Sequence, residues 1–151
     1  MDFATLHKQR KFIMIAALIG AIGTFLNWFT YPSIAIFNTS TGGGGIKGTS
    51  FGAGTFTLIG LLACGVLAYL GNQKEHLAKN TWLVVLGASA LATILCAIKL
   101  IQSSDYGGSI GIGLIISMVG AVATVAAAFI YKNPTDDLKQ SLNDIKKQVS
   151  K

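Results

Sequence analysis

Charged residues are scarce in this chain: only 12% of its 151 residues are Asp, Glu, Lys or Arg, whereas an average soluble domain carries about 25%. This shortage excludes a disordered chain, which combines low hydrophobicity with high charge. It also argues against a soluble globular domain, because so few charges cannot cover a water-exposed surface. Since 52% of the residues are hydrophobic, the composition indicates an integral membrane protein, and the length suggests a single domain.

Groups that carry catalysis or bind metals are also missing from the apolar parts of the sequence. No long apolar run contains Asp or Glu, which counts against small multidrug exporters that rely on a membrane-embedded glutamate. His7 and His76 are far apart and form no metal-binding pair. Cys64 and Cys96 form no C-x-x-C motif, and no run contains the two histidines of a haem site. We therefore expect no enzymatic activity, no cofactor and no metal.

Four long apolar runs are present instead, each close to the length of about 20 residues that a membrane-spanning helix needs. They cover residues 12–29, 51–70, 81–101 and 110–131. Lipid offers the backbone no hydrogen-bond partners, so each run should be helical. The sequence predicts an all-α membrane protein: a four-transmembrane-helix bundle over 1–131, followed by a tail over 132–151. A cleaved signal peptide is the alternative for the first run, which exceeds the usual apolar length of about 7–15 residues.

The basic residues are distributed unevenly between the two predicted sides of the membrane. Ten of the twelve fall on one side: Lys8, Arg10, Lys11, Lys74, Lys79, Lys132, Lys139, Lys146, Lys147 and Lys151. Only Lys47 and Lys99 fall on the other side. The positive-inside rule then places both termini in the cytoplasm, at a plasma membrane or a bacterial inner membrane. Topology explains the net charge of +6, and no nucleic-acid partner is expected.

The first outer loop, residues 30–54, is longer than most structureless connections. Residues 31–37 are rich in β-branched and aromatic side chains, residues 42–45 are four glycines, and 46–51 can return as a second strand. This pattern predicts a small extracellular β-hairpin that turns at the glycines. A flexible linker is the alternative, because ordering four glycines costs much conformational entropy.

Candidate functional residues gather at the predicted outer ends of the spans. Lys99 is the one charge inside the third run. Its side chain either snorkels to the interface or pairs with Asp105, or else it belongs to an anion or lipid-headgroup site. Asn27 and Trp28 close the first run. We expect Trp28 to anchor the helix at the interface and Asn27 to hydrogen-bond between helices.

Small residues at four-residue spacing allow membrane helices to approach closely. The fourth run has the widest such stripe, which we expect to pack on two neighbours or to form an oligomer contact; it includes Gly113, Ser117, Gly120 and Ala121. The tail is predicted to form a short amphipathic helix whose apolar face is Leu138, Leu142, Ile145 and Val149. That face needs a cover, which is the anionic inner leaflet, a second copy of the chain or a different protein.

Four spans, cytoplasmic termini, a large first outer loop with predicted strands and Trp28 at its start resemble the claudin and PMP22-type tetraspan proteins. The claudin loop signature, a W…GLW motif with two cysteines, is absent, so barrier function is not implied. The chain is also similar to small four-span bacterial proteins that have a Trp closing the first helix and a Gly-rich loop before the second.

The sequence therefore predicts a non-enzymatic multi-pass membrane protein. We expect a structural or accessory subunit that acts through helix packing, the outer loop and the C-terminal helix. Its partners are the lipid bilayer and either further copies of the chain or another membrane protein. The alternative is a small pore, holin-like or channel-like, that conducts only as an oligomer; the lack of a wide polar stripe on any run argues against it.

Overall fold

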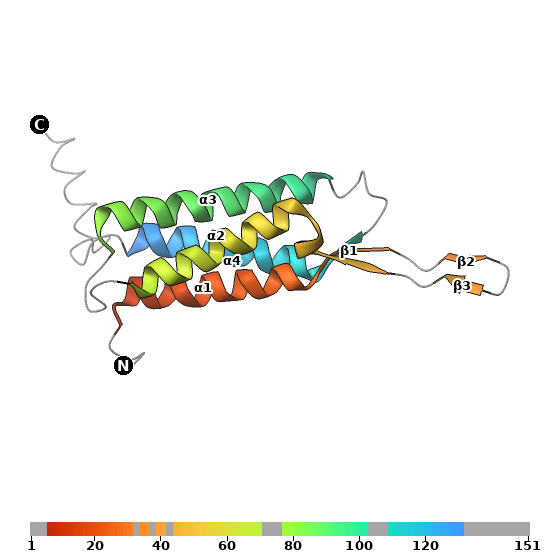
Figure 1. The fold of residues 1–151 in the computed structure, drawn as a ribbon, viewed down its shortest axis with the longest axis horizontal. Coiled ribbons are helices and arrows are strands. Elements are labelled where there is room, and N and C mark those ends of the chain that lie inside the picture. Colours follow the sequence, from red (N-terminus) through yellow and green to blue (C-terminus); the bar gives the residue numbers. More distant parts are fainter. Residues whose placement is uncertain are drawn as a thin grey trace, which may run out of the picture.

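A computed structural model describes residues 6–31, 34–36, 39–41, 44–70, 77–102 and 109–131. Its main elements are four helices, which pack side by side as a bundle (Figure 1). They are α1 (Lys8–Phe25), α2 (Gly52–Tyr69), α3 (Lys79–Ile101) and α4 (Ile112–Ile130). The predicted tail helix and its apolar face lie outside the described residues, as does Asp105. The helical bundle expected from the apolar runs is confirmed.

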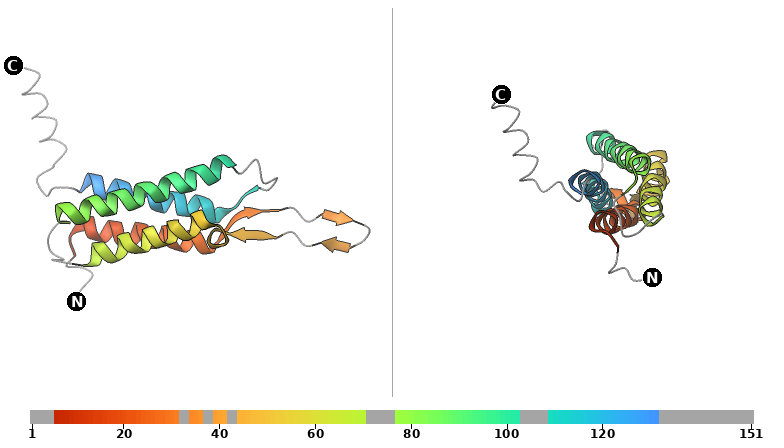
Figure 2. Two further views of the ribbon diagram at one scale, coloured as in Figure 1. Left: turned by 45° about the horizontal axis from the view of Figure 1, so that its top comes forward. Right: turned by 90° about the vertical axis from the view of Figure 1, so that its left-hand side faces the viewer.

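The helices form a closed ring in which each packs on its neighbours in sequence and α1 also packs on α4 (Figure 2). Large apolar side chains cover the outward faces of the ring, among them Ile22, Phe56, Leu83 and Val119. Three helices, α2, α3 and α4, are long and apolar enough to cross a membrane. Helix α1 is apolar from residue 12 onward, but its first turn carries Lys8, Arg10 and Lys11. The bundle is that of an integral membrane protein.

The interior of the bundle is filled by small and medium-sized side chains, including Ile13, Leu61, Val85 and Ala121. Buried hydroxyl groups bond carbonyl oxygens of their own helices. Thr57 donates to Ala53 (2.8 Å), Ser89 to Val85 (2.7 Å) and Thr124 to Gly120 (2.8 Å). Buried polar groups are stable in an apolar interior only when they are hydrogen-bonded in this way. The hydroxyl groups at these three positions are therefore satisfied within the core of the bundle.

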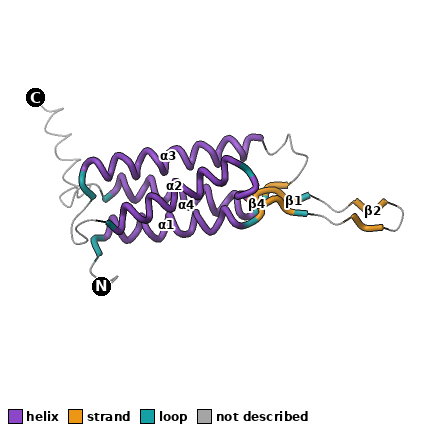
Figure 3. The backbone as a smooth tube through the Cα atoms, viewed as in Figure 1, coloured by secondary structure: helices purple, strands orange, loops and turns teal. Residues whose placement is uncertain are grey.

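A small antiparallel sheet covers one end of the bundle. Its central strand β1 (Asn27–Thr30) pairs with β4 (Gly45–Lys47) on one side and with β5 (Ser109–Ile110) on the other. Two further strands, β2 (Ile34–Ile36) and β3 (Thr39–Thr41), pair with each other farther from the helices. Figure 3 shows these strands as an arm that extends away from the bundle. A short 3-10 turn, η2 (Gly48–Ser50), leads from β4 into α2.

The end of the first predicted span, residues 12–29, is wrong. Helix α1 ends at Phe25, Leu26 is already extended with ψ 165°, and residues from Asn27 onward form β1. The apolar run continues through Trp28 and Phe29, but these residues pair with β4 and β5 instead of extending the helix. The other three predicted runs agree with α2, α3 and α4 to within two residues at each end.

The predicted hairpin in the first outer loop exists, but its predicted pairing is wrong. Ile34 lies opposite Thr41 and Ile36 opposite Thr39, so the chain reverses between β2 and β3 and not at the glycines. Gly45 instead begins β4, opposite Thr30 of β1. Pairs of β-branched residues stabilise antiparallel strands, and they favour this register over the expected one.

Candidate functional site

Trp28 fixes the sheet to one end of the bundle. Its indole is fully buried, and Nε1 donates a hydrogen bond to the Gly23 carbonyl oxygen of α1 (3.3 Å). The same edge of the indole, at Nε1 and Cε2, lies against Gly48 of η2, where a Cβ atom would overlap the ring and would lie 2.7 Å from the Thr24 carbonyl oxygen. Trp28 is thus a core residue at the junction of α1, β1 and η2, and not the interfacial anchor expected from the sequence.

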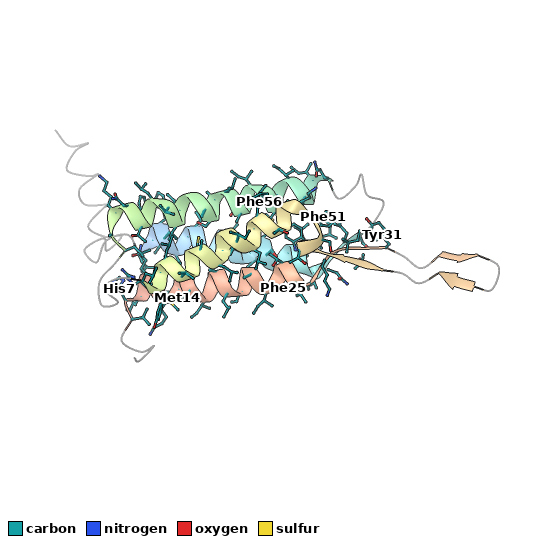
Figure 4. All side chains as sticks on the ribbon, viewed as in Figure 1. His7, Met14, Phe25, Tyr31, Phe51 and Phe56 are labelled. Carbon is teal, nitrogen blue, oxygen red and sulfur yellow. The ribbon has the colours of Figure 1, made fainter. Side chains whose placement is uncertain are left out.

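An aromatic cluster surrounds this junction. Trp28 and Phe29 of β1 are buried together with Cys96 of α3 and Leu114 of α4. The ring of Phe51, just before α2, meets Phe29 edge to face with centroids 5.4 Å apart, a geometry that aromatic pairs favour. Figure 4 shows Phe51 and Tyr31 at the sheet end of the molecule and His7 at the opposite end. The cluster holds the sheet in one position relative to the helices.

Glycines allow α4 to begin directly against β1. Gly111 donates its N–H to the Trp28 carbonyl oxygen (2.8 Å), and a Cβ atom at Gly113 would lie 2.8 Å from the Asn27 carbonyl oxygen. The side chain of Asn27 is exposed and lies against Gly45 of β4. It sits in the sheet and not between helices, so the expected interhelical hydrogen bond of Asn27 does not match its position.

Lys99 lies half-buried in the last turn of α3, near the aromatic cluster. Its Nζ donates to Gln102 Oε1 (3.0 Å) and lies 5.4 Å from the centroid of the Phe51 ring. A cation over an aromatic face is attracted by the ring quadrupole. These contacts favour local pairing of Lys99 over the headgroup-site interpretation, although the partner expected from the sequence, Asp105, lies outside the described residues.

At the opposite end of the bundle, two polar side chains of α1 cap the ends of other helices. Arg10 is 4% exposed, and Nη1 donates to the carbonyl oxygens of Ala68 (2.9 Å) and Leu70 (2.6 Å). These carbonyls belong to the C-terminal end of α2, where a helix lacks internal donors and carries partial negative charge. The guanidinium group therefore compensates both the unpaired oxygens and the helix dipole.

Gln9 bonds a carbonyl oxygen near the C-terminal end of α4 in the same way. Its Nε2 donates to the Ala128 carbonyl oxygen (3.2 Å), and its Oε1 accepts from the Leu77 N–H (3.0 Å). Trp82 Nε1 donates to the same Ala128 oxygen (2.7 Å). The sequence reasoning did not identify this cluster. A signal was present, because Gln9 lies four residues before the buried Ile13 and so extends the inward face of α1 by one turn.

The small-residue stripe of α4 faces α1. All four of its predicted members, Gly113, Ser117, Gly120 and Ala121, are buried. Gly23 of α1 is so close that a Cβ atom there would lie 2.6 Å from the Ser117 backbone nitrogen. The Ser117 hydroxyl has no hydrogen-bond partner among the described residues. The stripe thus makes a helix contact inside one chain, so these four residues are not free for an oligomer contact.

In the part of the chain that the structure describes, three or more His, Cys, Asp or Glu side chains that could hold a metal ion nowhere come together. Cys64 and Cys96 are free and buried in the bundle. Comparison with known proteins found no matching family model, no matching curated protein and no matching solved structure. A functional assignment therefore depends on the geometry of this chain alone.

Proposed function

We propose that this chain is a non-enzymatic membrane protein with four spans and both termini in the cytoplasm, which acts as an accessory subunit by binding a partner protein through its outer arm. The observation that carries the proposal is the arm itself, formed by β1 with β4 and by β2 with β3 (Figure 1). Its base is held by the buried Trp28. A tetraspan resemblance agrees with this arrangement of a bundle and an outer sheet.

Packing between α1 and α4 supports a fourth span. The two helices are in contact along their whole length, from Gln9 beside Ala128 at one end to Gly23 beside Gly113 and Ser117 at the other. A helix that follows a spanning helix over this distance crosses the same thickness of bilayer. The cations of its first turn then lie at the membrane surface, where lysine and arginine are tolerated.

The positions of the charges support the orientation. Lys8, Arg10 and Lys79 lie at the starts of α1 and α3, at the end of the bundle opposite the sheet, whereas Lys47 and Lys99 lie at the sheet end. Cations accumulate on the cytoplasmic side of membrane proteins. The sheet and the arm are then outside the cytoplasm.

Among the described residues, β4 and β5 are the edge strands of the three-stranded sheet and can offer their outer edges to a partner. Strand β4 is an edge strand, and β1 is the central strand between β4 and β5. An exposed edge can bind an extended segment of another protein through main-chain hydrogen bonds. The pore alternative lacks comparable support, because a pore between copies would be lined by outward faces of the bundle, and those faces carry large apolar side chains such as Ile22, Phe56 and Val119.

The orientation can be tested with a reporter enzyme that is active only outside the cytoplasm. We expect no activity when it is fused after Lys151 and full activity when it is inserted between β2 and β3. The insertion is the matched control for expression, because β2 and β3 lie away from the bundle (Figure 1). Activity at Lys151 would overturn the proposed orientation.

The interaction role can be tested by shortening the arm. Tyr31 donates its N–H to the Gly44 carbonyl oxygen (2.9 Å), so residues 32–43 can be replaced by Asn-Gly, which forms tight hairpin turns. We expect the full chain, purified in mild detergent, to retain a stoichiometric protein partner that the shortened chain loses. A chain truncated after Lys132 is the matched control and should keep the partner. Retention by all three chains, or ion conduction by the purified chain in liposomes without a partner, would contradict the proposal.

A further inference from the structure

An apolar groove runs along the outside of the bundle where α1 meets α4, on the half of the molecule opposite the sheet. Its volume is about 350 Å³. Buried small residues, Ala16, Gly120 and Ala127, form its floor, and exposed larger ones, Ile19, Val119 and Ile130, form its rims. The groove exists because α1 and α4 approach through residues without bulky side chains. In a bilayer it opens toward lipid.

The end of the groove nearest the membrane surface has a defined shape. The rings of Phe12 and Tyr131 stack there with centroids 5.3 Å apart and an interplanar angle of 1°. Helical periodicity places Lys8 one turn before Phe12 and Lys11 one turn before Ile15, which also lines the groove. Lys8 is exposed and Lys11 is half-buried. The first turn of α1, with its positive dipole end, therefore adds cationic groups at the mouth of an apolar groove.

Two other apolar grooves lack this combination. The groove between α1 and α2 is lined by Met14 and Leu62, and the cation one turn before Met14 is Arg10, which is buried on the carbonyls of α2. The groove between α3 and α4 is lined by Leu100 and Ile115 at the sheet end. The neighbouring cation there, Lys99, lies in the last turn of α3, where the negative end of the helix dipole disfavours a phosphate group.

We propose that the α1–α4 groove binds an anionic phospholipid of the cytoplasmic leaflet, with an acyl chain in the groove and the phosphate at Lys8 and Lys11. Charge complementarity selects this occupant, because lysines beside a membrane surface attract anionic headgroups. The assignment to the cytoplasmic leaflet rests on the orientation proposed above, whereas the groove and its lysines do not depend on it.

The test is native mass spectrometry of the full chain in detergent, with added phosphatidylglycerol or phosphatidylcholine of identical acyl chains. We expect phosphatidylglycerol to bind more tightly. In the double variant Lys8→Gln, Lys11→Gln its affinity should fall about tenfold or more, to the level of phosphatidylcholine. The double variant Lys47→Gln, Lys79→Gln loses the same charge elsewhere and should bind like the natural chain. Equal affinity for the two lipids, or equal loss in both double variants, would overturn the proposal.

A second variant tests the groove separately from the charges. Ala126 lines it and is half-buried, so Ala126→Phe should fill the groove and weaken binding of both lipids. Gly87→Phe adds the same ring on α3, where a Cβ atom meets nothing within 4 Å, and should leave binding unchanged. If Ala126→Phe instead abolishes a dimer and leaves lipid binding intact, a second copy occupies the groove and the lipid proposal is wrong. Reporter activity at Lys151 would refute the assignment to the cytoplasmic leaflet but not the preference for anionic lipid. Failure of the proposed orientation and failure of the lipid site are therefore distinguishable.

Discussion

Replacing Gly120 with leucine is expected to push α1 and α4 apart and to destabilise the whole bundle. A Cβ atom at Gly120 would overlap the backbone of Gly20 and would lie 2.9 Å from the Ala16 carbonyl oxygen. The obstacle is backbone and not the end of a flexible side chain, so the helices must separate. Overpacking in a well-packed core costs about 1–3 kcal/mol and sometimes more. The loss is measured as a lower temperature at which the detergent-purified chain leaves its monodisperse peak.

Two control variants show whether the effect is specific to this contact. Gly87→Leu adds the same side chain to the outward face of α3, in open space, and should change stability little. Ser117→Ala removes a buried hydroxyl that has no partner among the described residues. It should be neutral or stabilising, because an unsatisfied polar group is costly to bury. If the Gly120→Leu and Gly87→Leu chains leave the monodisperse peak at the same temperature, then α1 and α4 do not pack as described.

The contact between α1 and α4 illustrates which parts of the fold can be predicted from the sequence. Helices α2, α3 and α4 were expected almost to their ends, because an apolar run of the right length has only one stable backbone form in lipid. Small residues such as Gly113 and Gly120 indicated close helix packing. Spacing along one helix, however, does not say which neighbour a stripe meets, so the sequence allows both a neighbouring helix and an oligomer, whereas the structure places α1 against the stripe.

The end of α1 could not be predicted because the competing interaction is non-local. Trp28 and Phe29 suit a membrane helix by hydropathy and a strand by β propensity. The strand wins here through pairing with β4 and with β5, which come from different parts of the chain. Arg10 shows the same limit, since its charge predicts a membrane boundary, whereas its burial depends on where α2 ends.

The pairing of β1 with both β4 and β5 also joins the α1–α2 connection and the α3–α4 connection into one sheet. Phe29 lies opposite Ile46 on one side and Ile110 on the other. An arm built on this sheet is held by the first outer loop, the start of α4 and the aromatic cluster together. A partner that binds at β4 would therefore meet a strand of fixed position, which reduces the entropy lost on binding.

Replacing Trp28 with alanine is expected to release the arm from the bundle. The indole is fully buried between α1 and η2, and Trp→Ala in a core costs about 3–5 kcal/mol because a cavity replaces the ring. Since α1 and α4 still pack through Gly20 and Gly120, we expect the sheet to open before the helices separate. Limited proteolysis between β4 and α2 should therefore become faster while the helical content measured by circular dichroism is retained.

Two comparison variants separate the effect of losing the buried ring from the effect of losing its hydrogen bond and from the general effect of losing an aromatic side chain. Trp28→Phe keeps a ring but loses the bond to the Gly23 carbonyl oxygen, and we expect a smaller loss of about 1 kcal/mol. Phe56→Ala removes an aromatic ring that is 67% exposed on the outside of α2, and it should leave proteolysis unchanged. Variants that are cleaved faster should also capture less of the partner protein, because a loosened arm loses more conformational entropy when it binds. A Trp28→Ala chain that resists protease like the natural chain would show that the arm is not anchored by this residue.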